Sequence, residues 1–422
     1  MYRNIQRLIP TQNTRLFSTV KLLKAERINA EEVRVSLGRG ATTFHAPWLA
    51  HNCSCPKCRQ ESSGQRLAQK SPPRSIEAVE VSEDQSKLRV EFSKDHVGEF
   101  SADFLDQHRY DSLTVRARSM SLSALSRTKK AEPVRLDYNQ ANSSRKSTLQ
   151  WMEAVINDGV VIVENSPPKE EVLLDFIKHT GCESSHQLYG KTFVVEATAN
   201  PLNVAYSSEA LEAHQDLAYY ESPPGIQLLH CLEFDEKIQG GLSTFVDGHA
   251  AAEILRRDDP DAFQVLCRVP ATFQKDHVRR ADPAKMYYQR PHILTNELGD
   301  VTAIFWAPPF EGPLRASHED VMPYYKAYDK FAAIMASEEL WAQHAMEFKL
   351  RKGDLMVFNN RRYLHGRTAF TVPVDSKGFR KLHGCYLEMD RFLNRIRVMH
   401  WEENGTAVYD LKSRPGTSSY RN

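Results

Sequence analysis

The chain contains HQD at residues 214–216 and, far downstream, GDLMVFNNRRYLHGR at residues 353–367. In a β-strand, residues i and i+2 point to the same face of the sheet. His214 and Asp216 on one strand would therefore present an imidazole and a carboxylate side by side. In the second stretch, a turn at the glycine begins an apolar strand, and His365 lies beyond its polar end. We predict that the two stretches fold together and that the three side chains converge on one metal ion.

Two histidines and one carboxylate leave half of a metal's coordination sphere open. This facial arrangement is typical of non-haem Fe(II) oxygenases. The carboxylate of Asp216 favours hydroxylation, because iron halogenases of this class leave that position to chloride. A single His-x-Asp is a weak signal in a chain with 16 histidines, so the prediction rests on the order and spacing of the residues.

An iron site with open positions needs a chelating co-substrate, and 2-oxoglutarate is the natural candidate. Its distal carboxylate requires a buried cation, and the planar guanidinium of arginine suits a bidentate ion pair. Arg380 begins the apolar strand KLHGCY and is the residue that we predict for this contact. Ser243, in the stretch GGLST, is a candidate hydroxyl donor. The alternatives are a surface charge for Arg380 and a turn residue for Ser243.

A second metal site is predicted near the N-terminus. Cys53, Cys55 and Cys58 place three thiols within a short segment, and zinc takes four such ligands in a tetrahedron, usually Cys and His. The fourth donor has four candidates, which are His45, His51, His96 and His108. No ligand position is left for a substrate, so the site is expected to be structural. The alternative is a set of free or redox-active thiols.

The composition excludes several classes of protein. The chain has 422 residues and 48.2 kDa, which favours two or three domains, with 41% hydrophobic and 26% charged residues. Lys+Arg 55 against Asp+Glu 54 argues against a protein that coats nucleic acid, and no apolar run is long enough for a membrane helix. Seven cysteines are too few for a secreted disulfide framework.

The first residues differ from the rest of the chain. Five basic residues precede the first acidic residue, Glu26, and polar residues fill the gaps between them. Such an acid-free, arginine-containing and weakly amphipathic segment is typical of a mitochondrial transit peptide, which we predict for residues 1–25. The alternative is a disordered basic tail on a cytoplasmic protein.

The remaining chain divides into regions that differ in their predicted secondary structure. Residues 26–125 are predicted to form a β-rich zinc-binding domain, whose strands include residues 28–37, 87–92 and 113–115. Residues 133–402 carry many short strands with helical insertions. This pattern favours an α+β protein with a β-sandwich or jelly roll. Residues 403–422 are expected to be a tail. We also expect a helix capped by Ser147, and another over residues 338–348.

The motifs and their order resemble one family, the gamma-butyrobetaine and trimethyllysine dioxygenases, which use 2-oxoglutarate. The matching stretches are NVAY (203–206), HQD (214–216), PPGIQLLHC (223–231), GG (240–241), VDG (246–248), LHGR (364–367) and GCY (384–386). The likeness covers roughly residues 28–400. The resemblance also extends to the three cysteines of the N-terminal zinc module, whose fourth ligand in the family corresponds to His96.

The resemblance implies a double-stranded β-helix (jelly-roll) catalytic domain that binds Fe(II) and 2-oxoglutarate, depends on ascorbate and often forms a homodimer. It implies decarboxylation of 2-oxoglutarate to succinate, coupled by O₂ to hydroxylation of a small quaternary-ammonium substrate in carnitine biosynthesis. The first expectation is conversion of gamma-butyrobetaine to L-carnitine, and the runner-up is trimethyllysine hydroxylation. A distant alternative is a non-catalytic jelly-roll binding module.

A trimethylammonium group has no N–H and is bound by aromatic faces. The residues that match the family's substrate site are Tyr189, Phe193, Tyr206 and Tyr386 for the ammonium group and Asn203 for the carboxylate. Phe193 stands where the family usually has tryptophan. Leu217 stands where the butyrobetaine enzymes often have an aromatic residue, and either Tyr219 or Tyr220 is a candidate substitute.

Overall fold

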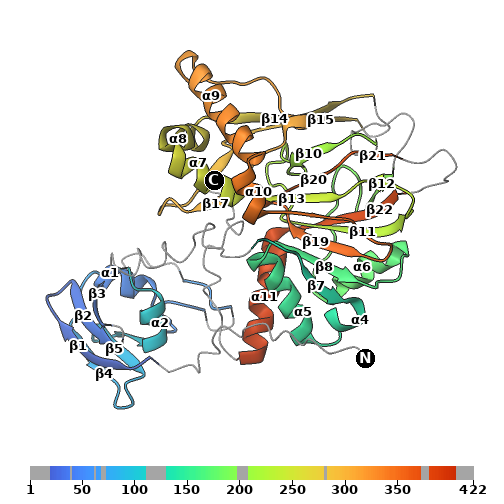
Figure 1. The fold of residues 1–422 in the computed structure, drawn as a ribbon. Coiled ribbons are helices and arrows are strands. Elements are labelled where there is room, and N and C mark those ends of the chain that lie inside the picture. Colours follow the sequence, from blue (N-terminus) through green and yellow to red (C-terminus); the bar gives the residue numbers. More distant parts are fainter. Residues whose placement is uncertain are drawn as a thin grey trace. The chain divides into compact units, whose positions relative to one another are not determined.

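The protein is described from a computed structural model. The structure describes residues 20–38, 40–60, 63–67, 73–110, 130–196, 208–279, 283–371 and 380–404. The chain forms two compact units, residues 1–118 and residues 119–422 (Figure 1). The predicted strand 113–115, most of the predicted presequence and nearly all of the predicted tail lie outside the described residues.

The first unit is β-rich, as predicted. Its two antiparallel sheets have three strands each: β1 (Leu22–Arg27), β2 (Glu32–Leu37) and β3 (Gly40–His45), then β4 (Ala78–Val81), β5 (Lys87–Ser93) and β6 (His96–Ser101). Two short helices, α1 (Ala46–His51) and α2 (Ala102–Gln107), follow β3 and β6. The core of this unit includes Phe44, Leu88 and the thiols of Cys53 and Cys58. The predicted strand 28–37 is wrong in its first part, because β2 begins only at residue 32.

The second unit is built on two sheets. The larger sheet has the order β7 (Val134–Asp137), β8 (Val160–Glu164), β19 (Leu355–Asn359), β11 (Ile226–Phe234), β22 (Arg380–Leu387) and β9 (Phe193–Glu196). The smaller sheet has the order β10 (Leu211–His214), β20 (Tyr363–Arg367), β13 (Ser243–Asp247) and β18 (Ala345–Phe348). All neighbours pair antiparallel except β7 and β8.

In two runs of the chain, before and after the segment between β13 and β18, the strands alternate between the two sheets. The chain passes from β10 to β11 and then to β13, and later from β18 through β19 and β20 to β22. Within each strand, side chains alternate between two layers. Leu228 of β11 packs against helices outside the larger sheet, whereas Leu229 belongs to the cluster between the sheets. The apolar side chains between the two sheets therefore form one wall of any pocket that opens there.

Helices cover the outer face of the larger sheet. α5 (Arg145–Asn157), α6 (Glu170–Lys178) and α11 (Met389–Asn404) contribute Trp151, Phe176 and Phe392 to one cluster with the strands (Figure 1). The short helix α4 (Tyr138–Ala141) precedes α5. Ser147 was predicted to be the N-cap of α5, and this prediction is wrong, because the N-cap is Ser144. Ser147 is the N3 residue of a capping box, in which each serine side chain bonds the other's backbone.

A long insertion separates β13 from β18. It comprises α7 (Gly248–Asp258), α8 (Pro260–Arg268), β14 (Ala271–His277), β15 (Ala284–Arg290), β16 (Ile293–Thr295), β17 (Val301–Ile304), η3 (Pro308–Phe310), α9 (His318–Met335) and α10 (Glu338–His344). These elements share their own large core, which includes Phe273, Trp306 and Phe331. Two short strands, β12 (Gln239–Gly240) and β21 (Phe370–Thr371), pair with each other. β12 comes just before β13 in the chain, and β21 comes just after β20.

One helix prediction is wrong at its end. The helix expected over residues 338–348 stops at residue 344, and the following residues form β18. The apolar spacing in this segment fits a helix or a strand. Residues 345–348 form a strand because they pair with β13.

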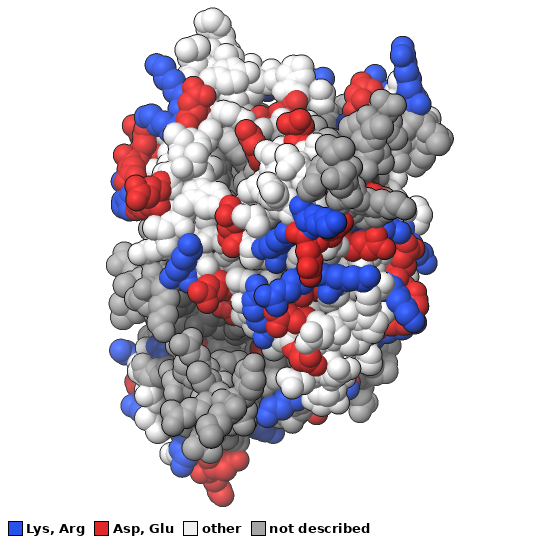
Figure 2. Space-filling view, turned by 45° about the vertical axis from the view of Figure 1, so that its right-hand side comes forward, with Lys and Arg blue, Asp and Glu red and all other residues white. Residues whose placement is uncertain are grey.

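The described helices include none that is both long and apolar enough to cross a bilayer. On the face drawn in Figure 2, lysine and arginine side chains lie among acidic ones. This distribution agrees with the balanced charge of the whole sequence.

Candidate active site

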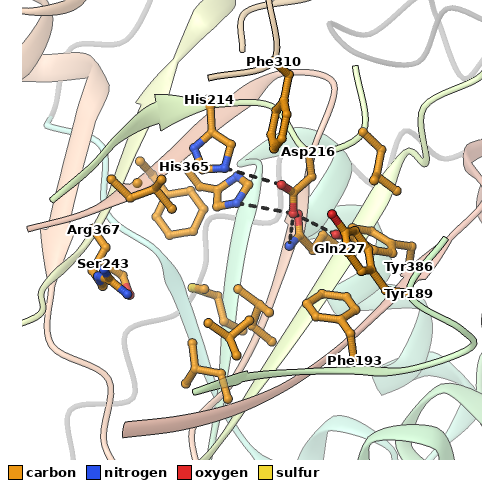
Figure 3. Close-up of a pocket in the computed structure, with 18 of the residues that line it drawn as sticks. Tyr189, Phe193, His214, Asp216, Gln227, Ser243, Phe310, His365, Arg367 and Tyr386 are labelled. Atoms are coloured by element: carbon orange, nitrogen blue, oxygen red, sulfur yellow. Dashed lines mark hydrogen bonds and ion pairs between the residues drawn. The ribbon is translucent and has the colours of Figure 1, made fainter. Parts of the chain in front are cut away.

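A pocket opens between the inner faces of the two sheets of the second unit. The smaller sheet contributes His214, Ser243, Phe245, His365 and Arg367, and the larger sheet contributes Phe193, Gln227, Leu229, Met356, Arg380, Leu382 and Tyr386. In Figure 3 the two histidines and Asp216 lie between Arg367 and Ser243 on one side and Tyr189, Phe193 and Tyr386 on the other. The pocket therefore has a cationic end and an aromatic end.

The structure brings the three predicted metal ligands together. One donor atom from each of His214, Asp216 and His365 lies within 4.8 Å of the others. His214 Nε2 is 3.4 Å from Asp216 Oδ1, and His365 Nε2 is 3.7 Å from Asp216 Oδ2. His214 and His365 face each other across the ladder between β10 and β20. The spacing fits a single metal ion.

The local geometry differs from the prediction in two ways. His365 lies within a strand of its own, β20, and not beyond the polar end of β19. Asp216 lies beyond β10, whose last residue is His214, so the two ligands do not share one strand face. The next residue, Leu217, has a φ of 59°, an unusual value for a residue with a side chain. This turn, and not strand periodicity, directs the carboxylate toward the histidines.

The protonation states of His365 and Asp216 suit metal binding, whereas the pKa of His214 is raised, because the hydrogen bond and charge of Asp216 outweigh the effect of burial. Nδ1 of His214 donates to the carbonyl of Glu212 at 2.8 Å, which leaves Nε2 as the free nitrogen. Burial, together with the neighbouring His214, lowers the pKa of His365 to about 3. Burial alone would raise the pKa of Asp216, but hydrogen bonding and charge from the two histidines outweigh it and the pKa lies below its usual value. A neutral imidazole and an ionised carboxylate are the forms that bind metals.

The cationic end of the pocket contains the two residues predicted for the co-substrate. Arg380 is the first residue of β22 and only 6% exposed, which excludes the surface alternative. Burial and the nearby Arg367 lower the pKa of Arg380 to about 10. Ser243 begins β13 and is buried, so it is not a turn residue.

Arg367 also lines the pocket, although its sequence position alone predicted no role for it. It faces Ser243 across the ladder between β13 and β20. Its guanidinium donates to the carbonyl of Glu209 at 2.5 Å and lies 4.9 Å from the ring centroid of Phe370. Its place two residues after His365, on the same strand face, was the signal that could have identified it.

The aromatic end contains three of the residues predicted for the substrate. Phe193 and Tyr386 stack with ring centroids 5.0 Å apart, and Tyr189 lies 6.3 Å from Phe193. Asn203 and Tyr206 lie outside the described residues.

Two further aromatic residues line the pocket. Tyr219 is buried there and meets Phe310 edge-on at 5.4 Å. Of the two tyrosines considered as substitutes at Leu217, it is therefore Tyr219 that lines the pocket. The hydroxyl of Tyr220 instead accepts a hydrogen bond from the backbone of Leu188. Phe310 comes from the long insertion, a distant segment that local sequence patterns could not connect to the site.

In the first unit, Cys53, Cys55, Cys58 and His96 lie together. Their donor atoms are within 4.8 Å of one another, and Cys58 Sγ is 3.1 Å from His96 Nε2. A side chain at position 98 would touch Cys53 Sγ at 3.0 Å, so Gly98 allows β6 to approach the thiols. This set of soft donors fits zinc.

The geometry selects one histidine from the four candidates. His45 contacts the hydroxyl of Tyr110 at 2.7 Å and His108 contacts the carbonyl of Phe104 at 2.8 Å. His51 pairs with Arg66 at 3.2 Å. Only His96 joins the thiols among the described residues.

Comparison with known proteins gives consistent matches. Residues 122–386 match the family model described as taurine catabolism dioxygenase TauD, TfdA family, and residues 26–106 match the gamma-butyrobetaine hydroxylase-like N-terminal model. The chain is 30% identical to dioxygenase str8 of Strobilurus tenacellus, with 84% of each chain covered. It is 29% identical to a gamma-butyrobetaine dioxygenase of Pseudomonas sp. (strain AK-1), covering 91% of this chain and 98% of the relative. It is 25% identical to the mitochondrial trimethyllysine dioxygenase of Mus musculus, covering 84% of this chain and 82% of the relative.

Proposed function

Because the chain belongs to the TauD/TfdA dioxygenase family and is an Fe(II)/2-oxoglutarate-dependent dioxygenase, we propose that it hydroxylates gamma-butyrobetaine to L-carnitine. The observation that carries the proposal is a pocket in which a candidate iron triad separates a cationic end from an aromatic end. The two ends differ in chemistry, as two different substrates require. A relative named gamma-butyrobetaine dioxygenase aligns over nearly its whole length and supports this choice of substrate.

Iron is held by His214, Asp216 and His365 in this proposal. Their donor atoms converge, one histidine tautomer is fixed by the backbone, and the carboxylate is ionised. Bound Fe(II) supplies the oxidising chemistry, in which O₂ and 2-oxoglutarate are consumed as a C–H bond is hydroxylated. The protein's part is to present three ligands from one side and leave the other side to the two substrates.

Arg380 and Ser243 bind the distal carboxylate of 2-oxoglutarate. Nε of Arg380 is buried and has no hydrogen-bond partner among the described residues. A buried cation with an unsatisfied donor is costly unless an anion binds to it. The hydroxyl of Ser243 adds a neutral donor at the same end of the pocket.

The aromatic end binds the trimethylammonium group. Tyr189, Phe193 and Tyr386 supply ring faces, each of which contributes about 0.5–2 kcal/mol to binding of a cation. Asn203 and Tyr206, which belong to the segment outside the described residues, complete the proposed site as carboxylate anchor and fourth ring. Tyr219 is a further candidate ring because it lines the pocket and its side chain interacts with that of Tyr189.

Trimethyllysine is the second candidate substrate. The relatives named trimethyllysine dioxygenase, mitochondrial, align over most of this chain, and the basic segment before Glu26 agrees with a mitochondrial location. The experiment is a parallel incubation of the iron-loaded protein with each substrate, 2-oxoglutarate and O₂. Formation of carnitine supports the proposal, and turnover of trimethyllysine alone replaces it with the second candidate. Absence of succinate release with both substrates would indicate a non-catalytic binding module instead.

Several wider features belong to the same proposal. The alternation of strands between the two sheets supports a double-stranded β-helix, or jelly roll, for residues 133–402. Residues 26–125 form the zinc-binding domain, in which Cys53, Cys55, Cys58 and His96 hold a structural zinc ion. Residues 1–25 act as a mitochondrial presequence and residues 403–422 as a tail. Ascorbate keeps the iron reduced, and the protein acts as a homodimer.

A further inference from the structure

The two oxygens of Asp216 have different surroundings. Oδ2 accepts a hydrogen bond from the hydroxyl of Tyr386 at 2.8 Å and another from Nε2 of Gln227 at 2.8 Å (Figure 3). Oδ1 faces His214 Nε2 at 3.4 Å, and Oδ2 also lies 3.7 Å from His365 Nε2. Two donors occupy the lone pairs of Oδ2, so Oδ1 is the oxygen left to bind a metal.

The two donors come from neighbouring strands of the larger sheet. Gln227 of β11 and Tyr386 of β22 are direct partners in the antiparallel ladder, and both side chains point into the pocket. Directly opposed residues of such a pair lie close enough to act on one atom. Asp216 belongs to the segment after β10, a strand of the smaller sheet. The two hydrogen bonds therefore join the sheets at the candidate metal ligand.

The backbone of Asp216 is fixed separately. The fully buried Asn360 accepts from the amide of Asp216 and donates to its carbonyl, both at 3.1 Å. Both bonds are made by the residue directly before Leu217, the position with positive φ. With the backbone held by Asn360, the remaining freedom of Asp216 is rotation of its carboxylate, and the two donors to Oδ2 restrict that rotation.

From this arrangement we propose that Tyr386 and Gln227 are positioning residues of the iron site, which fix Oδ2 of Asp216 so that Oδ1 faces the metal. The inference rests on the proposed iron site. It gives Tyr386 a second role besides its ring: the hydroxyl orients a metal ligand, while the ring stacks on Phe193 at the aromatic end. Supporting hydrogen bonds of this kind set ligand orientation in metal sites, and their loss typically weakens metal binding about 10- to 100-fold.

The test is anaerobic Fe(II) binding to the full-length chain by equilibrium dialysis. His214→Ala defines the iron bound elsewhere, and the difference from the wild type reports the site. Tyr386→Phe keeps the ring and removes only the hydroxyl, so we expect affinity to fall about 10- to 100-fold. Gln227→Leu should act in the same direction and provides an independent test if the first variant disturbs the fold.

Tyr324→Phe is the matched control, because it removes a buried tyrosine hydroxyl of the same unit that contacts Nε2 of His292 at 2.8 Å and does not line the pocket. Its iron affinity should equal that of the wild type. In the double variant, the losses from Tyr386→Phe and Gln227→Leu should be non-additive, because both donors act on one oxygen. Unchanged affinity in both single variants overturns the inference and leaves the proposed function intact. A wild type that binds no more iron than His214→Ala overturns both.

Discussion

Asp216 is the only acidic side chain among the described residues that line the pocket. Its charge is balanced by groups that converge from separate strands, and no second carboxylate from the described part of the chain lines the pocket to compete for the same cation. This single negative charge beside two imidazoles allows the site to hold a divalent metal and still attract anionic and cationic substrates at opposite ends.

The first prediction at the residue scale concerns His214. Replacing His214 with Ala removes one of three proposed ligands, so turnover should fall by at least about 100-fold, the upper range seen even for supporting groups of metal sites. Zinc content should stay the same, because the cysteine cluster belongs to the other unit. Metal analysis and product formation measure both effects. His179→Ala, at an exposed helix end, is the control and should retain iron and turnover.

Arg380 gives the second prediction at this scale. Arg380→Gln removes the buried charge, and the KM for 2-oxoglutarate should rise roughly 10- to 150-fold, as expected for a lost hydrogen bond to a charged group. Lys381→Gln is the matched control, because the next side chain on β22 pairs with Glu170 at 2.9 Å and does not line the pocket. Equal KM values for 2-oxoglutarate in all three proteins would show that Arg380 does not bind it.

At the scale of elements, the pairing of β9 with β22 builds the aromatic end. Gly384 lies opposite Phe193 in this ladder, and a Cβ at that position would come within 2.4 Å of the Phe193 ring. The glycine therefore makes the space in which Phe193 can stack on Tyr386. The position of the ring depends on the register of two strands that are distant in sequence.

Gly384→Ala tests this dependence. The added methyl group should displace the Phe193 ring and weaken binding of the quaternary ammonium by roughly the value of one ring, which raises its KM about 2- to 30-fold. The KM for 2-oxoglutarate should change little, because Arg380 lies at the other end of the pocket. Steady-state kinetics with each substrate varied in turn measures both constants. Gly38→Ala, where a Cβ meets no atom within 4 Å, is the control, and equal substrate KM values for the two variants would contradict the prediction.

At the scale of the whole molecule, each of the two units carries its own candidate metal site. The thiols and His96 join segments of the first unit, which has a small core that a bound metal can stabilise directly. Burial raises the pKa of Cys53 to about 12, so a bound cation is needed to keep this thiol ionised. The stability of the first unit should therefore depend on zinc.

Cys55→Ser should release zinc and lower the thermal stability of the first unit, while iron binding by the second unit is retained. Zinc analysis and scanning calorimetry of the full-length chain measure the two effects. Cys267→Ser, which alters a half-buried thiol of the second unit, should keep zinc. Unchanged zinc content in Cys55→Ser would exclude this cysteine as a ligand.

Residue type and order alone determined a large part of this protein. The spacing of His214, Asp216 and His365 predicted a metal site, and the three clustered cysteines predicted another. Apolar runs predicted β19 after Gly353 and β22 from Arg380, because hydrophobic patterning is a local property of the chain.

Only the tertiary structure decided which distant groups meet. It turned residues 345–348 into a strand, brought Phe310 from the insertion to the pocket, and joined His96 to the thiols. It also aligned Gln227 with Tyr386 so that both donate to Asp216. These contacts depend on strand register and on turns such as the one at Leu217, which are fixed by packing across the whole unit and not by the neighbouring residues in the chain.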